Sequence, residues 1–143
     1  MITLNEYNSS NDFGGLIGKL FEARDYAHYV HLHNSSYAKH KALGSFYGKI
    51  IDLADTLYET HTGQYGHVNF SVSMSKEKNE IQYFEDLGMT MKEGHKIFND
   101  KDTHLHNILD EIVGEIYSLL YKLKYLKWLL DFYSISLILF LPW

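Results

Sequence analysis

The sequence has no cysteine, no proline before Pro142, and fewer basic than acidic residues. Without cysteine, neither a disulfide framework nor a metal site built on thiolates can form. Without internal proline, long helices can run unbroken. The 13 Lys and Arg residues against 18 Asp and Glu give a net charge of −5, which argues against binding to nucleic-acid phosphates. We therefore expect no nucleic-acid partner.

Membrane-targeting features are also missing. The first 15 residues lack the basic start and the apolar stretch of a secretory signal peptide. The apolar run over residues 132–143 is shorter than the about 20 residues that a spanning helix needs. These features predict a cytoplasmic protein, located in the host cytoplasm if a phage encodes it.

Apolar residues recur at helical spacing in four stretches of the chain. They predict helices over residues 16–33, 36–60 and 75–98, and a fourth helix whose apolar stripe runs from Leu105 to Leu123. Asn, Ser and Asp residues lie between them, as is typical of turns and helix caps. The pattern predicts an all-α protein.

The links between these helices differ in length. The first and third links are short, which makes the helices they join antiparallel neighbours. The second link holds a cluster of helix breakers at 62–66 and an alternation of apolar and polar residues over 68–74, typical of an extended crossover or one short strand. One long crossover between two hairpins is the connectivity of ferritin-like four-helix bundles. We therefore predict one ferritin-like domain over residues 1–143, with residues 1–14 as an N-terminal arm.

Residues 128–143 form an apolar extension, which we interpret as a tail or a short fifth helix. The sequence leaves three alternatives: packing on the bundle or on a neighbouring subunit, docking to a membrane or a partner, or an extension foreign to the native chain. Exposed apolar surface of this kind promotes aggregation. We expect a homo-oligomer, a dimer or a larger shell, that buries it.

The residues best suited to chemistry lie in the first two predicted helices. His28 and His31 are one turn apart, His40 opens the next helix, and Asp55 and Glu59 share one face of that helix. Imidazole nitrogens combined with carboxylate oxygens suit iron, manganese or zinc. These five residues are the predicted metal ligands. The alternative is a set of solvated polar side chains on amphipathic helices.

Residues 16–59 resemble the first two helices of Dps-type mini-ferritins. In that family, a histidine near the end of the first helix is followed by a histidine that opens the second helix, and then by an Asp and a Glu four residues apart. Taking His28 as the first histidine reproduces the family's intervals to His40, Asp55 and Glu59. Taking His31 instead aligns His31, Leu32 and His33 with the family's His-Trp-His motif. Both alignments stay open.

The resemblance implies a ferroxidase. The histidines of one subunit would face Asp55 and Glu59 of a two-fold partner, iron(II) would be oxidised between them, and the assembled shell would store the iron. The chain departs from the family at Tyr29 or Leu32, in place of a tryptophan, and at Gly44, in place of a carboxylate. As a whole, the chain also resembles small helical proteins of tailed phages. That second resemblance implies an alternative function, a non-enzymatic accessory or virion interaction protein without metal.

The remaining histidines show no ligand spacing. His104 and His106 are two residues apart and so point to different sides of their helix. Asp102, just before them, is interpreted as a helix cap. His61 and His95 have no partner pattern, and we expect both to be solvated.

Overall fold

In a computed structural model, which describes residues 4–74 and 79–126, the chain is a bundle of four α-helices. They are α1 (Leu4–His33), α2 (Tyr37–Tyr65), α3 (Glu80–Glu93) and α4 (Thr103–Tyr125), and a 3₁₀ helix, η1 (Gly94–Ile97), follows α3. No β-strand occurs in the described ranges, so the predicted all-α class is confirmed. The alternating stretch over 68–74 is an extended crossover and not a strand.

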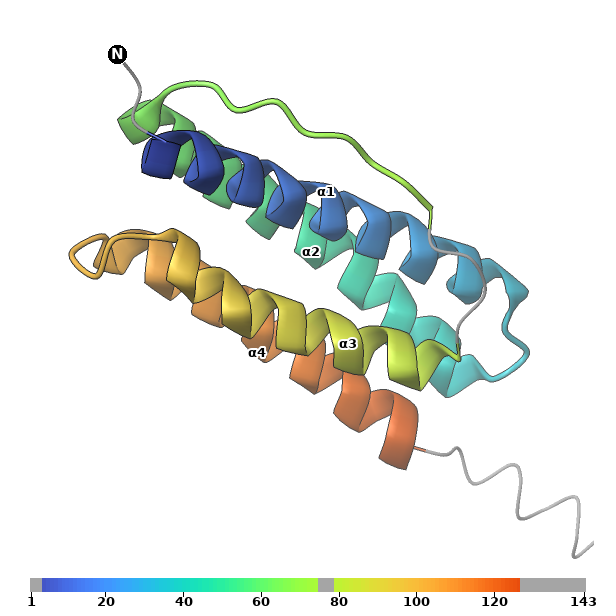
Figure 1. The fold of residues 1–143 in the computed structure, drawn as a ribbon. Coiled ribbons are helices and arrows are strands. Elements are labelled where there is room, and N and C mark those ends of the chain that lie inside the picture. The colour runs from blue at the N-terminus through green and yellow to red at the C-terminus, as the bar shows by residue number, and fades with distance from the viewer. Residues whose placement is uncertain (1–3, 75–78, 127–143) are drawn as a thin grey trace, which may run out of the picture.

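The helices form two antiparallel hairpins joined by one long crossover (Figure 1). α1 packs against α2 and α3, and α4 packs against the same two helices. The crossover runs back along the bundle, so α2 and α3 point in the same direction. On the surface, Lys49 of α2 pairs with Glu115 of α4, and Lys124 of α4 pairs with Glu85 of α3, each with an N–O distance of 2.5 Å. Exposed ion pairs of this kind contribute little to stability.

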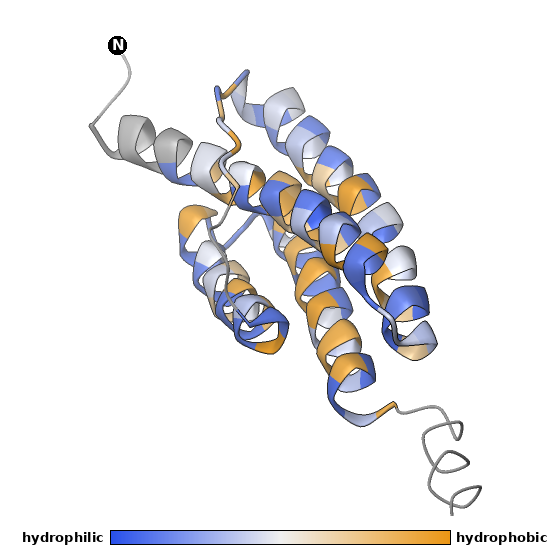
Figure 2. Ribbon diagram, turned by 90° about the vertical axis from the view of Figure 1, so that its right-hand side faces the viewer, coloured by the Kyte–Doolittle hydropathy of each residue, from blue (hydrophilic) through white to orange (hydrophobic). Residues whose placement is uncertain are grey.

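The apolar core holds the bundle together. Figure 2 shows hydrophobic residues as bands along the helices, with hydrophilic residues between them. Each fully buried Leu, Ile or Phe contributes about 1.5–3 kcal/mol relative to an exposed one. The largest fully buried side chains come from all four helices: Phe13, Ile17, Leu20, Leu43, Ile50, Leu57, Phe84, Met91, Leu105, Leu109, Ile112 and Ile116. None of the helices in the described ranges is long and apolar enough to cross a membrane.

The first helix begins earlier than the sequence predicts. We expected residues 1–14 to form an arm, but α1 begins at Leu4. The reason lies at Phe13, which is fully buried and stacks on His61 of α2 with 3.7 Å between the ring centroids. This tertiary contact overrides the weak helix propensity of the Asn- and Ser-rich start. The predicted extension over 128–143 lies outside the described residues.

The second helix also runs further than predicted, through the cluster of helix breakers to Tyr65. It ends at Gly66, whose φ is 90° and whose N–H donates to the Thr62 carbonyl at 2.9 Å. Glycine adopts a positive φ at little cost, which makes it a common helix terminator. The added turn brings Gln64 and Tyr65 to Asp102 at the start of α4.

The third helix is shorter than the predicted range of 75–98. It begins after Asn79, whose side chain accepts a hydrogen bond from the N–H of Ile81 at 2.9 Å and so caps the helix. At Gly94 the helix tightens into η1. A Cβ on Gly94 would lie 2.9 Å from a methyl group of Leu16, so the absence of a side chain lets α1 approach closely here.

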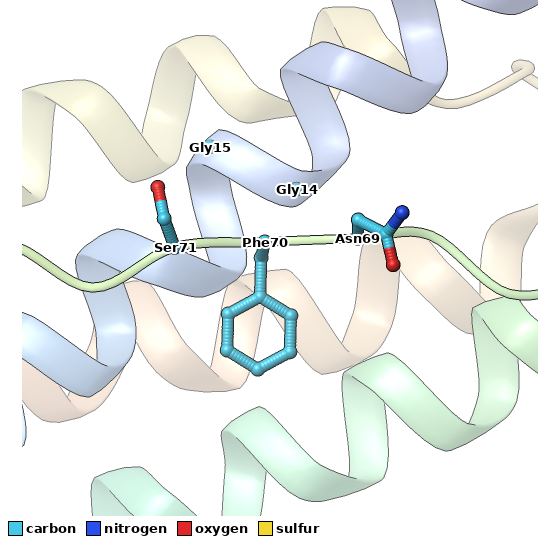
Figure 3. A pocket seen from close by; sticks show the side chains of 5 residues that line it. All are labelled: Gly14, Gly15, Asn69, Phe70 and Ser71. Atoms are coloured by element: carbon cyan, nitrogen blue, oxygen red, sulfur yellow. The ribbon is translucent and has the colours of Figure 1, made fainter.

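The crossover lies directly on α1 because glycines form the surface beneath it. A Cβ on Gly14 would lie 2.4 Å from the carbonyl oxygen of Asn69, and a Cβ on Gly18 would lie 2.3 Å from that of Ser71. No other residue type permits contacts this short. Figure 3 shows the chain passing over the helix beside a hollow of about 400 Å³. The residues that line this hollow have no ionisable side chain, so it offers no carboxylate or imidazole to a metal.

His61 is buried, so the prediction that it is solvated is wrong. It is 8% exposed, and its Nδ1 has no hydrogen-bond partner among the described residues. Burial lowers the pKa of the ring below its usual value of 6.5, although the charge of Asp102 opposes the shift. The unfolded chain therefore binds this proton more tightly than the folded chain. The contribution of His61 to stability is complete above about pH 6.5 and is lost as the pH falls below that value.

Replacing His61 is expected to reduce the loss of stability in mild acid. Between pH 7.5 and pH 5.5, the wild type should lose on the order of 1 kcal/mol more unfolding free energy than His61→Phe. Phenylalanine can keep the stack on Phe13 but cannot be protonated. Urea unfolding at the two pH values measures the difference. The exposed control His33→Phe should behave like the wild type, and equal acid losses in wild type and His61→Phe would contradict the assignment.

Candidate functional site

His31 and His40 form a reciprocal pair where α1 ends and α2 begins. The Nδ1 of His31 lies 2.7 Å from the carbonyl oxygen of His40, and the Nδ1 of His40 lies 3.0 Å from that of His31. Their rings stack with 3.7 Å between centroids and 23° between planes. The link over 34–36 is short because Ser36 caps α2 directly after α1 ends. This short link brings His31 and His40 next to each other. The pair is therefore held by backbone geometry.

This geometry determines which nitrogen of each ring carries a proton. A carbonyl oxygen can only accept, so each Nδ1 must donate. In the neutral ring, each Nε2 then keeps its lone pair, and neither Nε2 has a hydrogen-bond partner within the described part of the chain. Histidines that bind metals commonly donate one ring N–H to a backbone carbonyl and coordinate through the other nitrogen. In each neutral ring, Nε2 is therefore the nitrogen that could bind a metal.

His28 lies beside this pair without joining it. Its ring centroid is 6.1 Å from that of His31, and it stacks on Tyr47 at 4.4 Å. Tyr47 also meets His31 edge-on at 5.4 Å. Of the two histidines that the spacing left open as the partner of His40, the structure places His31 against it. His28 is an exposed third imidazole one turn away.

Asp55 and Glu59 are exposed further along α2 and do not reach the histidines. They follow His40 by 15 and 19 residues, which corresponds to about 22 and 28 Å along a helix axis. Across 4–74 and 79–126, no three His, Cys, Asp or Glu side chains come close enough together to hold one metal ion. One subunit therefore brings together only the histidine part of the predicted ligand set.

The outer surface of α2 between these two groups is open. A Cβ on Gly48 would meet no atom within 4 Å. A Cβ on Gly44 would lie 3.0 Å from the ring of His31. The absence of a side chain at Gly44 thus makes room for His31 to stack on His40.

Sequence reasoning missed a polar cluster at the opposite end of the bundle. Asp102 is buried and accepts hydrogen bonds from the Tyr65 hydroxyl and from Nε2 of Gln64, the latter at 2.9 Å. These two bonds, that of Tyr65 above all, hold the pKa of the Asp102 carboxyl below its usual value of 3.8. Asp102 occupies the N-cap position of α4, as predicted, but its side chain makes no capping hydrogen bond there. Asp102 instead ties α2 to α4.

His95 and His106 form a second network near that end. Their Nδ1 atoms are 2.8 Å apart. The Nε2 of His95 lies 3.1 Å from the carboxylate of Asp110, and the Nε2 of His106 lies 3.1 Å from the carbonyl oxygen of Asn99. All four ring nitrogens are engaged, so neither ring presents a free lone pair to a metal. The His95 side chain is 29% exposed and so remains partly solvated, but it also has partners that the sequence did not predict, because no spacing rule reveals a contact between η1 and α4.

Comparison with known proteins finds a family of unknown function and a phage relative. The model of a family of unknown function, DUF5856, matches residues 31–123, a range that includes His31, His40, Asp55 and Glu59. An uncharacterized 14.6 kDa protein in the mobD-ri intergenic region of Enterobacteria phage T4 is 24% identical over 108 residues, which cover 76% of this chain and 84% of the phage protein. No solved structure matches the chain. The predicted resemblance to small phage proteins is confirmed, and the resemblance to mini-ferritins stays a prediction.

Proposed function

This chain belongs to the family of unknown function DUF5856, and we propose that it is a homo-oligomeric, ferritin-like metal-binding protein that holds iron between two subunits. The His31–His40 pair carries the proposal, because each Nδ1 donates to a carbonyl oxygen and neither Nε2 has a hydrogen-bond partner within residues 4–74 and 79–126. Two helical hairpins with one long crossover support the ferritin-like part of the proposal. Since its T4 relative is a phage protein, we place its action in the cytoplasm of an infected host.

A two-fold arrangement of α2 would complete the ligand set. Gly48 lies eight residues after His40 and seven residues before Asp55. When two α2 helices cross antiparallel at Gly48, His40 of one copy lies level with Asp55 of the other. The missing side chain at Gly48 allows the two backbones to approach closely. Each dimer would then hold two such sites, and neither site would be complete in a single subunit.

The chemistry of this ligand set suits iron(II) oxidation. Two imidazole nitrogens and two carboxylates bind iron(II), and the carboxylates balance the extra positive charge of iron(III). With peroxide as the oxidant, two iron(II) ions each give one electron to one peroxide molecule. The peroxide takes up two protons and leaves as two water molecules. In this scheme His31 and His40 position the metal, while Asp55 and Glu59 of the second copy stabilise the oxidised product.

Removing the carboxylates is expected to abolish this activity. The double variant Asp55→Ala/Glu59→Ala should bind iron(II) more than about 100-fold more weakly, because it loses two direct ligands and even outer-shell partners contribute 10–100-fold. Anaerobic titration with iron(II), followed by oxidation monitored by absorbance on addition of peroxide, measures both steps. The variant His31→Ala/His40→Ala should show the same loss. The exposed residues Glu111 and His33 provide matched controls, as Glu111→Ala and His33→Ala.

The outcomes separate two classes of protein. Stoichiometric iron in the wild type, lost in both double variants and kept in both controls, supports the shared site. A folded wild-type oligomer that binds no iron refutes the proposal. The chain would then be a phage interaction protein that has the bundle without a metal.

A further inference from the structure

The outer surface of α4 carries a strip of exposed aromatic side chains near its C-terminal end. Tyr117, Tyr121 and Tyr125 recur every four residues along one side of the helix and are 40%, 57% and 69% exposed. Leu126, just after the helix, is 46% exposed, and the rings of Tyr121 and Tyr125 lie 5.8 Å apart. These four residues are called the α4 strip below. Contiguous apolar surface of this kind commonly marks a docking site.

Two lysines beside the α4 strip are already engaged, one by a carboxylate and one by a ring of the strip. Lys124 pairs with Glu85 of α3 at 2.5 Å. The ammonium group of Lys92 of α3 lies over the ring of Tyr117, 4.6 Å from its centroid. The α4 strip itself consists of uncharged side chains. Its surface therefore suits an uncharged, apolar partner better than an acidic or basic one.

The chain itself contains such a partner. Residues 132–143 include no charged side chain and consist almost wholly of Ile, Leu, Phe, Tyr and Trp with two serines and one proline. The core of the described bundle is already filled by its four helices, so this segment can only dock on the outside. We propose that residues 132–143 dock on the α4 strip of their own chain.

Distance favours this surface over others. The connection over 127–131 spans at most about 18 Å when fully extended. The α4 strip from Tyr117 to Leu126 is about 14 Å long, so all of it lies within reach of the start of the segment. A short tether also keeps the segment at an effective concentration of about millimolar. The exposed apolar residues of the crossover lie on the other side of the bundle from α4 (Figure 1).

Photo-cross-linking in the full-length protein tests the proposal. Benzoylphenylalanine replaces Tyr121, which keeps an aromatic ring at that position. The same cross-linker at Leu32, which is 66% exposed at the same end of the bundle, serves as the matched control. A mixture of ¹⁴N- and ¹⁵N-labelled chains distinguishes products within one chain from products between chains. The variant Ile138→Asp places a charge within the segment and should remove most of the product.

The expected result is a product that joins position 121 to residues 132–143 in chains of a single isotope, with little product from position 32. Mixed-isotope products would overturn the proposal in favour of docking between copies. If the cross-linker at position 32 captured most of the product, the segment would dock near the link between α1 and α2, and the proposal would be overturned. Co-sedimentation with phosphatidylcholine–phosphatidylglycerol vesicles, without a product at position 121, would overturn it in favour of a membrane surface. None of these outcomes depends on whether the protein binds iron.

Discussion

Replacing Phe84 with alanine is expected to lower the free energy of unfolding by about 3–5 kcal/mol. Phe84 is fully buried in α3, where it meets the rings of Phe46 at 5.3 Å, Tyr83 at 5.1 Å and Tyr26 at 5.9 Å. These neighbours come from three helices that are each held by other contacts, so they cannot close around an alanine. The variant keeps a cavity in addition to losing buried apolar surface. Because a domain of this size is stable by about 5–15 kcal/mol, the loss is a large fraction of the total.

Urea unfolding at pH 7.5 measures this effect, and two variants calibrate it. Phe84→Leu retains most of the side-chain volume and should lose clearly less stability than Phe84→Ala. Phe70→Ala removes a ring that is 39% exposed on the crossover and should also lose less. A loss at Phe84 no larger than the loss at Phe70 would show that α3 does not pack into the core through this ring.

Replacing Gly48 with arginine is expected to abolish the proposed α2–α2 dimer and the proposed iron binding while the subunit stays folded. No atom lies within 4 Å of a Cβ at this position, so the side chain fits within the subunit. Arginine is also a better helix former than glycine by nearly 1 kcal/mol, and thus the fold should become slightly more stable. Between two α2 helices in close contact, however, two arginines would add bulk and positive charge at the crossing point. The antiparallel pair could not form, and each histidine pair would lose its carboxylates.

Light scattering on a size-exclusion column and anaerobic iron(II) titration test this prediction together. Gly114→Arg provides the control, since a Cβ on Gly114 also meets no atom within 4 Å and this residue belongs to α4, outside the α2 surface that the proposed dimer uses. The control should keep both the oligomer and the metal. A Gly48→Arg protein that remains dimeric and binds iron like the wild type would show that α2 does not form the shared interface.

The sequence by itself determined the helical elements and the buried side of each. The stripe from Leu105 to Leu123 predicted the buried face of α4, and the long link predicted the crossover over 66–74. Both are local properties, because burial of one helix face leaves a period in the sequence and a change of period marks the link. The candidate ligands in the first two helices were also predicted from local spacing, which selected the histidines on either side of the link over 34–36.

Tertiary structure decided the features that depend on contacts between distant segments. α1 includes Phe13, which packs on His61, and α2 extends to Tyr65, where its side chain meets Asp102. These partners lie more than 35 residues apart, and no local pattern records such a pairing. Burial likewise set the protonation behaviour of His61, which its sequence neighbours do not indicate.

For the candidate site, too, the sequence predicted one part and tertiary structure decided the other. Spacing selected His28, His31 and His40, but it could not choose between the first two. The structure chose His31, because the turn over 34–36 aligns its Nδ1 with the carbonyl of His40 and Gly44 leaves room for its ring. Spacing also placed Asp55 on the same side of α2, although the helix rise keeps it about 22 Å from His40 in one subunit. Periodicity reports which side of a helix a residue occupies, and only tertiary and quaternary packing decide which residues meet.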